Sequence, residues 1–203
     1  MNPLKEWTGD FSRQPAELPI EAERLLRAQG CPNTAQHSAA VAAEAGQLAE
    51  RFGLSHIAAT HAAWLHDISA IIPTPQRLRA AQSLGLEVLP AEAQAPGLLH
   101  QKLSVILAAQ VFQVDDAAQL SAIGCHTTLK AQAAPLDLLL FVADKLAWDQ
   151  AGPAPFHPAM RAALQHSLAA AAWAYLKHLR ASLPHLHPWA EAAYWELAEQ
   201  FQA

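Results

Sequence analysis

The chain has 203 residues, of which 52% are hydrophobic and 15% are charged, and this composition predicts a globular protein with a sizeable core. Its net charge is −5 with neutral histidines, and its lysines and arginines form no cluster, so we expect no nucleic-acid polymer as a partner. Because only Cys31 and Cys125 are present, a disulfide framework is excluded and a reducing cytoplasm is the expected compartment. We expect a soluble protein without a membrane partner, since the sequence shows neither a signal-peptide pattern nor an uncharged apolar run of membrane-spanning length.

Apolar residues at helical spacing, together with helix-end signals, predict helices along most of the first half of the chain. Residues 1–18 are expected to be an irregular lead-in. The helices that follow should end at glycine or proline, because glycine adopts the left-handed C-terminal conformation and proline cannot continue a helix. The predicted helices are 19–28, then 34–52 with Thr34 as its cap and Gly53 at its end, 57–68 with Ser55 as its cap, and 75–85 with Thr74 as its cap.

The second half continues the helical pattern after a predicted loop over residues 86–97. The helices expected there are one that opens at His100, one capped by Asp115 that ends at Cys125, one that starts at Pro135, one over 158–183 and a last one from Pro188. No segment carries a strand signal, so the predicted fold class is all-α. We divide the chain into the lead-in 1–18, a helical core 19–183 and a C-terminal helix 184–203 that packs on the core.

Two positions combine polar side chains with strongly apolar surroundings. His66 and Asp67 follow an apolar helical run, and Asp144 ends the apolar stretch of the helix that starts at Pro135. Burying a polar group without a hydrogen-bond partner costs roughly 2–7 kcal/mol. A buried carboxylate without a partner therefore costs several kcal/mol or stays protonated. A bound metal ion removes that cost, and these positions therefore suggest metal ligands.

Further histidines lie at helix starts and ends where they can join these residues. The candidate ligands are His37, His66, Asp67, His100, His126 and Asp144. Ligands spread over several helices are typical of metal sites in bundle cores. A single histidine of this kind is more often a packed core residue than a ligand, so the hypothesis depends on the set. Imidazole and carboxylate ligands without thiolate favour iron, manganese or zinc, and the number of ligands favours two ions that share Asp67.

The order of these residues resembles the HD-domain metal-dependent phosphohydrolases, and within them the YqeK family. The resemblance covers about residues 20–180 and rests on "HSAAVAAEAGQLAERFGL" at 37–54, "AAWLHDIS" at 62–69, "LLHQKLSVILA" at 98–108, "IGCHTT" at 123–128 and "LLLFVADKL" at 138–146. It implies an HD-domain helical bundle with iron favoured among divalent metals. It also implies symmetrical hydrolysis of diadenosine tetraphosphate to two ADP by a metal-bound hydroxide, with His66 and Asp67 as the catalytic pair and all six candidates as ligands.

Four residues near these motifs are candidate substrate contacts. Lys145 and Lys102 could bind phosphate or be solvated surface lysines, and for Lys102 the surface role is preferred. Thr127 and Thr128 could bond phosphate or cap their turn, with neither role favoured. Polyphosphate substrates need such groups, because the acidic chain offers few other cations.

Two departures from the family pattern concern substrate handling. The family lysine shortly after the HD pair is missing, since Ala70 stands there and no basic residue follows until Arg77. The stretch after Lys145 also differs from the family's "IEPGR". The leading hypothesis is therefore a phosphohydrolase with a nucleotide substrate, acting on an acid anhydride or phosphate ester, as a monomer or homodimer. The alternatives are a different nucleotide or phosphate-ester substrate and a non-catalytic module that binds metal or nucleotide.

Overall fold

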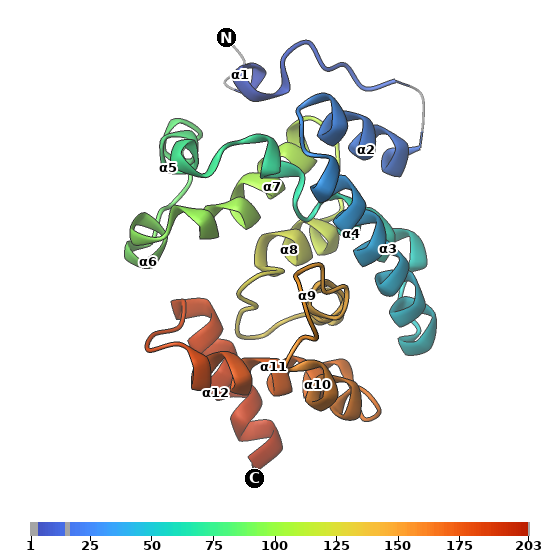
Figure 1. Cartoon of the computed structure of the whole chain (residues 1–203), viewed down its shortest axis with the longest axis vertical. Coiled ribbons are helices and arrows are strands. Elements are labelled where there is room, and N and C mark those ends of the chain that lie inside the picture. The colour runs from blue at the N-terminus through green and yellow to red at the C-terminus, as the bar shows by residue number, and fades with distance from the viewer. Residues whose placement is uncertain (1–3, 15–16, 203) are drawn as a thin grey trace.

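The computed structural model describes residues 4–14 and 17–202, and regular structure in these ranges is helical, without a strand. The elements are named by type and chain order in Figure 1. They are α1 (Lys5–Thr8), α2 (Leu18–Ala28), α3 (Pro32–Phe52), α4 (His56–Leu65), η1 (Ile68–Ile71), α5 (Thr74–Ser83), α6 (Pro90–Gln94), η2 (Pro96–Leu99), α7 (His100–Gln110), α8 (Ala117–Cys125), α9 (Pro135–Leu146), α10 (His157–Ala163), α11 (Leu168–Ser182) and α12 (Pro188–Gln202). The predicted all-α fold class is confirmed.

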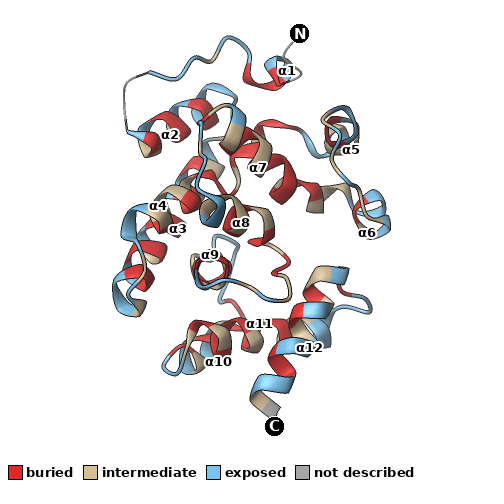
Figure 2. Ribbon diagram, turned by 180° about the vertical axis from the view of Figure 1, so that it is seen from behind, coloured by how far each residue is buried: buried red, intermediate tan, exposed pale blue. Residues whose placement is uncertain are grey.

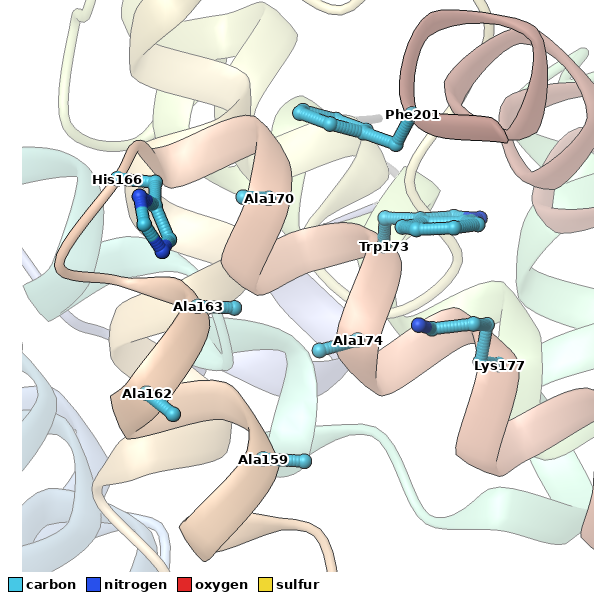
Figure 3. A pocket seen from close by; sticks show the side chains of 9 residues that line it. All are labelled: Ala159, Ala162, Ala163, His166, Ala170, Trp173, Ala174, Lys177 and Phe201. Carbon is cyan, nitrogen blue, oxygen red and sulfur yellow. The ribbon is translucent and has the colours of Figure 1, made fainter. Parts of the chain in front are cut away.

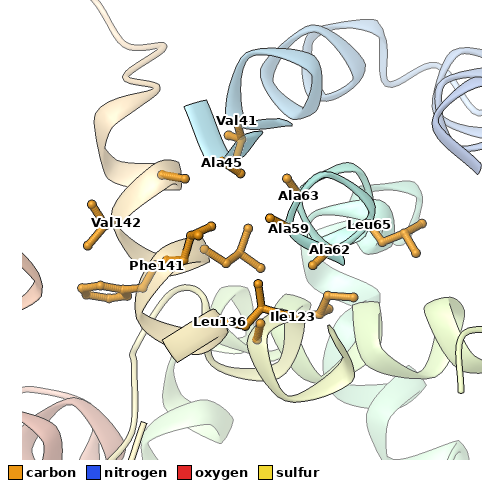
Figure 4. Close-up of a cluster of buried hydrophobic side chains, with 14 of the residues drawn as sticks. Val41, Ala45, Ala59, Ala62, Ala63, Leu65, Ile123, Leu136, Phe141 and Val142 are labelled. Atoms are coloured by element: carbon orange, nitrogen blue, oxygen red, sulfur yellow. The ribbon is translucent and has the colours of Figure 1, made fainter. Parts of the chain in front are cut away.

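The core that positions the polar residues lies between α3, α4, α8 and α9. Helix α4 packs against the other three, and small residues on α4 let the helix backbones approach one another closely. Figure 4 shows side chains of these helices pointing toward one another, among them Ala45 of α3, Ala62 of α4 and Ile123 of α8, all fully buried. In Figure 2 the buried residues of these helices face the interior, whereas exposed residues line the outside and the connecting turns. This core fixes the ends of α4, α8 and α9 relative to one another.

Several predicted helix ends are confirmed. Gly53 ends α3 in the left-handed conformation with φ of 68°, and its N–H donates to the Ala49 carbonyl. The Ser55 side chain caps α4 by accepting from the backbone N–H of Ala58. Helix α7 begins at His100 and α9 begins at Pro135, as the apolar periodicity and the proline signal predicted. Three of the chain segments that carry candidate ligands therefore start or stop as expected.

Other predicted caps are wrong by a few residues. Helix α3 already begins at Pro32 with Cys31 as its N-cap, because proline suits the first turn, so Thr34 lies inside the helix. Asp116 rather than Asp115 caps α8, and its carboxylate accepts from two backbone N–H groups. Helix α5 begins at Thr74, which therefore belongs to the first turn.

Larger differences concern four segments. The predicted lead-in 1–18 contains α1, whose Trp7 is buried; residues 1–3, 15 and 16 of it lie outside the described part. The predicted loop 86–97 contains α6 and the start of η2. The predicted helix 158–183 is split into α10 and α11, because the Ser167 side chain caps a new helix start. Helix α4 stops at Leu65, so the predicted end at Ile68 is wrong.

The C-terminal part of the chain packs below α9 in Figure 1, with α11 against both α9 and α12. The boundaries proposed for the core and the C-terminal helix stay a prediction. Among the described helices, none is long and apolar enough to cross a membrane.

Candidate metal centre

The stop of α4 at Leu65 places His66 and Asp67 in the turn before η1, facing the centre of the helical core. The His66 side chain has no exposed surface, and Asp67 is 29% exposed. Behind this turn, buried serines connect the segment to α7, since Ser69 donates to the His100 carbonyl and Ser104 donates to the Ser69 hydroxyl. These bonds fix the spacing between the turn and the start of α7, where the next histidine lies.

Three histidines in this region share one hydrogen-bonding arrangement. In each, Nδ1 lies within hydrogen-bond distance of the carbonyl oxygen three residues earlier. A carbonyl only accepts, so Nδ1 carries the proton and the Nε2 lone pair of a neutral ring points away from it. The pairs are His66 with Ala63 at 2.6 Å, His100 with Gly97 at 2.7 Å and His126 with Ile123 at 2.8 Å.

Asp67 lies between these rings and turns a different oxygen toward each side. Its Oδ2 is 3.5 Å from Nε2 of His66, while its Oδ1 is 3.4 Å from Nε2 of His100 and 3.5 Å from Nε2 of His126. Asp67 therefore belongs to two groups of ligand-competent atoms, one with His37 and His66 and the other with His100 and His126, each within 4.8 Å. A carboxylate between two such groups has the position of a bridging ligand.

His37 and Asp144 complete the first group. Nε2 of His37 lies 3.0 Å from Oδ1 of Asp144, and the same oxygen lies 3.6 Å from Nε2 of His66. His37 comes from the second turn of α3 and Asp144 from the last turn of α9, so the core packing brings together residues that are far apart in the chain. We call His37, His66, Asp67, His100, His126 and Asp144 the His/Asp cluster. The structure assembles all six candidates, and their role as metal ligands stays a prediction.

The donor atoms of the His/Asp cluster are better satisfied by a divalent cation than by hydrogen bonds to one another. In the described part of the chain, Nε2 of His66 is buried without a hydrogen-bond partner. Nε2 of His100 and Nε2 of His126 are 3.0 Å apart although both Nδ1 atoms face carbonyls, so two lone pairs meet unless a proton or cation lies between them. The set of imidazole and carboxylate donors without thiolate suits iron, manganese or zinc.

Burial and the charges of neighbouring cluster residues shift the pKa values of the His/Asp cluster. Burial lowers the pKa of His66, but the carboxylates of Asp67 and Asp144 outweigh burial and raise that pKa to about 9. Burial opposes ionisation of Asp67 as well, yet the neighbouring imidazoles hold the pKa of Asp67 far below its usual range. Burial lowers the pKa of His100 to about 4, so that ring is neutral and ready to coordinate near neutral pH.

Lys145 is the predicted substrate contact that lies at the cluster. Its ammonium donates to the Asp144 carboxylate at 2.5 Å and to the His126 carbonyl at 2.9 Å, over the ring of Tyr175. It lines a pocket of about 270 Å³ that also reaches Asp67 and His37. Lys145 therefore places a positive charge at the entrance to the cluster, and it is not the solvated surface lysine of the alternative interpretation.

The two threonines differ in their contacts. The Thr127 hydroxyl lies 2.8 Å from Nε2 of His100, so it faces the cluster. The Thr128 hydroxyl is buried and donates to the Leu129 carbonyl, and it also lies 3.2 Å from the side-chain amide of Gln101. Thr128 stabilises its own turn, and of the two only Thr127 is positioned to meet a ligand.

The structure supports neither interpretation of Lys102, the phosphate contact or the solvated surface lysine. It is buried rather than solvated, and its ammonium donates to the Glu92 carboxylate at 2.8 Å and to the Glu87 carbonyl at 3.0 Å. The ring of Trp189 lies 4.9 Å from the same ammonium. These partners use the charge of Lys102 within the fold, so a phosphate contact by Lys102 is not supported.

Some residues at the site carried no sequence signal for a role. Asp149 follows α9, and its Oδ2 is 3.4 Å from Nδ1 of His37, where it can orient that ring. Arg77 of α5 donates to the Gly97 carbonyl, which also accepts from His100, and the Arg77 charge acts on Asp67. Arg77 thus supplies a cation behind the cluster although the lysine expected at Ala70 is missing. Only a side-chain structure reveals such contacts between distant segments.

A separate pocket of about 400 Å³ lies between α10, α11 and α12 (Figure 3). Alanines form most of its lining, and Trp173 stacks on Phe201 there with ring centroids 5.5 Å apart. His166 and Lys177 are its titratable residues, and the Lys177 ammonium lies 3.8 Å over Trp173. No residue of the His/Asp cluster lines this pocket, so it offers no comparable chemistry in the described part.

Comparison with known proteins agrees with this geometry. The family described as HD domain matches residues 34–149, a range that holds all six residues of the cluster. A relative from Lactococcus lactis subsp. cremoris, described as an uncharacterized protein in the pepC 5' region, is 41% identical over 137 residues, which make up 67% of this chain and 70% of the relative. That relative carries no stated activity.

A solved structure shares the fold. The crystal structure of a predicted HD superfamily hydrolase involved in NAD metabolism, from Clostridium acetobutylicum, superposes with a TM-score of 0.79 at 22% sequence identity. The match covers 88% of this chain and 95% of the other. At this identity the likeness shows that the arrangement of helices is the same.

Proposed function

Because the chain belongs to the HD domain family, we propose that it is a metal-dependent phosphohydrolase of nucleotides, acting within the cytoplasm. The substrate that we propose is diadenosine tetraphosphate, split symmetrically into two ADP as in the YqeK family. The sequence motifs around all six residues of the His/Asp cluster support this substrate. The proposed cofactor is a pair of divalent ions, with iron favoured over manganese or zinc.

The observation that carries the proposal is the position of Asp67. Its two oxygens face separate groups of imidazole nitrogens, at 3.5 Å from His66 on one side and 3.4 Å from His100 on the other. A structural salt bridge needs one partner on each side, whereas this arrangement brings three imidazole nitrogens toward one carboxylate. Two divalent cations would be held by these residues, with Asp67 common to both groups of ligands.

Divalent ions bound here supply Lewis acidity and lower the pKa of a water molecule, which is the chemistry that hydrolysis of a phosphoanhydride needs. The residues of the chain prepare the place for it. The backbone carbonyls behind His66, His100 and His126 hold each ring in the tautomer that presents Nε2. Lys145 brings an ammonium group to the entrance, where it can pair with a phosphoryl oxygen. The Thr127 hydroxyl offers a further donor beside His100.

Charge supports a phosphate substrate at this site in particular. The chain carries a net charge of −5, so its surface does not attract anions in general. The ions proposed for the cluster, together with Lys145, concentrate positive charge at one pocket and confine anion binding to it.

Two alternatives remain open because of the departures from the family pattern. The first is a phosphohydrolase with another nucleotide or phosphate ester, since Ala70 replaces the family lysine and Leu146–Gln150 replaces "IEPGR". The solved neighbour is described as involved in NAD metabolism, so dinucleotides of that kind belong in the substrate panel. The second is a module that binds metal and nucleotide without turnover.

The test is an anaerobic assay of iron-loaded protein with diadenosine tetraphosphate and a panel of mononucleotides, dinucleotides and phosphate esters. Release of ADP at two per substrate, absent from a His66→Ala variant, supports the proposed reaction. Faster turnover of another compound than of diadenosine tetraphosphate supports the first alternative, a phosphohydrolase with a different nucleotide or phosphate-ester substrate. Tight nucleotide binding without any product selects the binding module and contradicts the enzyme.

A further inference from the structure

A second pocket, of about 560 Å³, opens beside the His/Asp cluster. One wall is a stripe of α3, and the other is the end of α9 with the residues that follow it. Its size lies within the range of about 300–1,000 Å³ that is usual for small-molecule sites. The stripe of α3 consists of positions spaced as one helix face, namely Asn33, Gln36, His37 and Ala40.

This pocket is continuous with the entrance to the cluster. His37, Ala147, Trp148 and Asp149 line both the pocket of about 560 Å³ and the cluster pocket of about 270 Å³. Nε2 of His37 points to Asp144 in the cluster, while the same ring borders the larger pocket. A ligand with phosphates at the cluster therefore has the larger pocket as the space for its next group.

The lining of the larger pocket does not suit phosphate. Among its described residues there is no lysine or arginine, and Asp149 adds a carboxylate that is 59% exposed. A carboxylate repels phosphate but accepts hydrogen bonds from hydroxyl groups such as those of a ribose. The phosphates of a nucleotide are thus directed to the cluster and its neutral part to this pocket.

Trp148 offers a flat, oriented surface in this pocket. Its Nε1 donates to the Gly152 carbonyl at 2.9 Å, and its ring meets the edge of Phe156 at 5.3 Å and 82°. These contacts hold the indole at the boundary between the two pockets, and it forms part of the wall of each. Aromatic side chains held in this way stack on nucleobases, since every base presents a π-face.

Two amides lie across the pocket on α3. Asn33 and Gln36 are exposed and one helical turn apart, and within the described residues no hydrogen bond involves either side chain. Each amide offers both a donor and an acceptor, the combination that pairs with the edge of a base. Free amides and an indole in one pocket are the groups that recognise a nucleobase.

We propose that the larger pocket is the nucleoside subsite of the enzyme. The base stacks on Trp148, Asn33 and Gln36 contact the base edge, and Asp149 accepts from the ribose hydroxyls. The inference rests on the proposed function, because it takes the phosphates to be at the His/Asp cluster. Trp148 and Asp149, which take the base and the ribose, lie where the chain departs from the family pattern after Lys145.

The experiment compares ADP with inorganic pyrophosphate as ligands of the metal-loaded full-length protein, by calorimetry. Wild-type protein is expected to bind ADP more tightly than pyrophosphate. In Trp148→Ala the affinity for ADP should fall by about tenfold while that for pyrophosphate stays near the wild-type value. Trp195→Ala, which removes an exposed tryptophan of α12, is the matched control and should change neither affinity.

A second variant guards against a folding defect in Trp148→Ala. Asn33→Ala combined with Gln36→Ala changes exposed side chains only, and it should reduce the preference for ADP over UDP. An unchanged ADP affinity in Trp148→Ala, or an equal loss for ADP and pyrophosphate, overturns the nucleoside subsite and leaves the proposed function standing. Binding of neither ligand by the wild-type holoprotein contradicts the proposed function itself.

Discussion

Two buried polar clusters in the described part of this protein can be compared, and they differ in how their charges are satisfied. The His/Asp cluster brings four imidazoles and two carboxylates together. The second, which we call the Glu92 cluster, consists of Glu92, Lys102, His187 and Trp189. Glu92 pairs with Lys102 at 2.8 Å and faces Nε2 of His187 at 3.4 Å, and thereby connects α6 and α7 with the start of α12.

In the Glu92 cluster the carboxylate pairs with the ammonium group of Lys102, although Oε1 of Glu92 and Nε2 of His187 make no hydrogen bond within the described part of the chain. In the His/Asp cluster, Nε2 of His66 has no hydrogen-bond partner among the described residues, and Nε2 of His100 and Nε2 of His126 face each other at 3.0 Å. Glu92 has no exposed side-chain surface whereas Asp67 is 29% exposed, so burial alone does not identify a ligand site. The His/Asp cluster is distinguished by two imidazole nitrogens, Nε2 of His100 and Nε2 of His126, that face each other beside the shared carboxylate of Asp67.

The largest expected difference between the clusters is in metal binding and activity. Asp67→Asn removes the shared charge, so the protein should lose its metal and its hydrolytic rate should fall on the order of 1,000-fold, equivalent to about 4 kcal/mol of transition-state stabilisation. Metal analysis and the rate of ADP release measure this. Glu92→Gln, which neutralises a buried carboxylate outside the His/Asp cluster, is the control and should keep its metal; loss of metal in both variants contradicts the distinction.

The next effect is on stability. Lys102→Met leaves the Glu92 carboxylate buried without its cation, so the free energy of unfolding should fall by about 3 kcal/mol. Combining Lys102→Met with Glu92→Leu removes both charges and should recover most of the loss. Denaturant unfolding of the metal-loaded protein provides the measurement, with metal content unchanged in each variant. A single variant as stable as wild type shows that the pair does not stabilise the fold.

The pH dependence of metal binding is a smaller effect. The raised pKa of His66, about 9, means that the metal-free site holds a proton on this ring at neutral pH. Metal uptake must release that proton, so affinity should weaken by about tenfold for each pH unit below 9. Calorimetry in buffers with different ionisation enthalpies counts the released proton. Affinity that is constant between pH 7 and 9 contradicts the assignment of His66.

In the metal-free protein the same pKa has the opposite consequence for folding. Because the folded pKa of His66 is raised, its charge contributes stability fully below the ordinary pKa of about 6.5, and this contribution is lost as pH rises through about 9. Metal loading should remove this loss, since the ion replaces the proton. Thermal unfolding of both forms across this range measures the difference.

The smallest effect is expected at an exposed ion pair. Arg180 of α11 and Glu191 of α12 are 2.8 Å apart, with exposed side-chain fractions of 38% and 45%. Water and salt screen such a pair, so Glu191→Gln should shift the unfolding midpoint by less than the error of the measurement. A clear loss of stability shows instead that this contact, and not the Glu92 cluster, holds α12 in place.

The sequence predicted the parts of this arrangement that depend on local physics. The Gly53 helix end, the Ser55 cap and the proline start of α9 follow from backbone preferences of those residues, and the structure has them where they were expected. His66, Asp67 and Asp144 could be selected because a polar side chain after an apolar helical run is costly without a partner, and the other three histidines because they stand at helix starts or ends. The structure shows that they lie together.

The parts that the sequence did not predict depend on contacts between distant segments. Lys102 looked like a surface lysine because nothing near it in sequence reveals Glu92 as its partner across the α6–α7 turn. Asp149 and Arg77 reach the cluster from segments without a motif. The break between α10 and α11 was also missed, because the Ser167 cap stands inside a continuous alanine-rich pattern. The periodicity of apolar residues predicts one helix at a time. The partners of a side chain in another segment depend on how the helices pack, which periodicity does not show.

The most direct test of the central claim is the metal content of protein purified without oxygen, measured beside Asp67→Asn. The two groups that share Asp67 predict about two ions per chain in the wild type and a loss of both in the variant. Wild-type protein that binds no divalent ion, even after iron, manganese and zinc are offered, contradicts the account and leaves the His/Asp cluster as a polar core without a ligand.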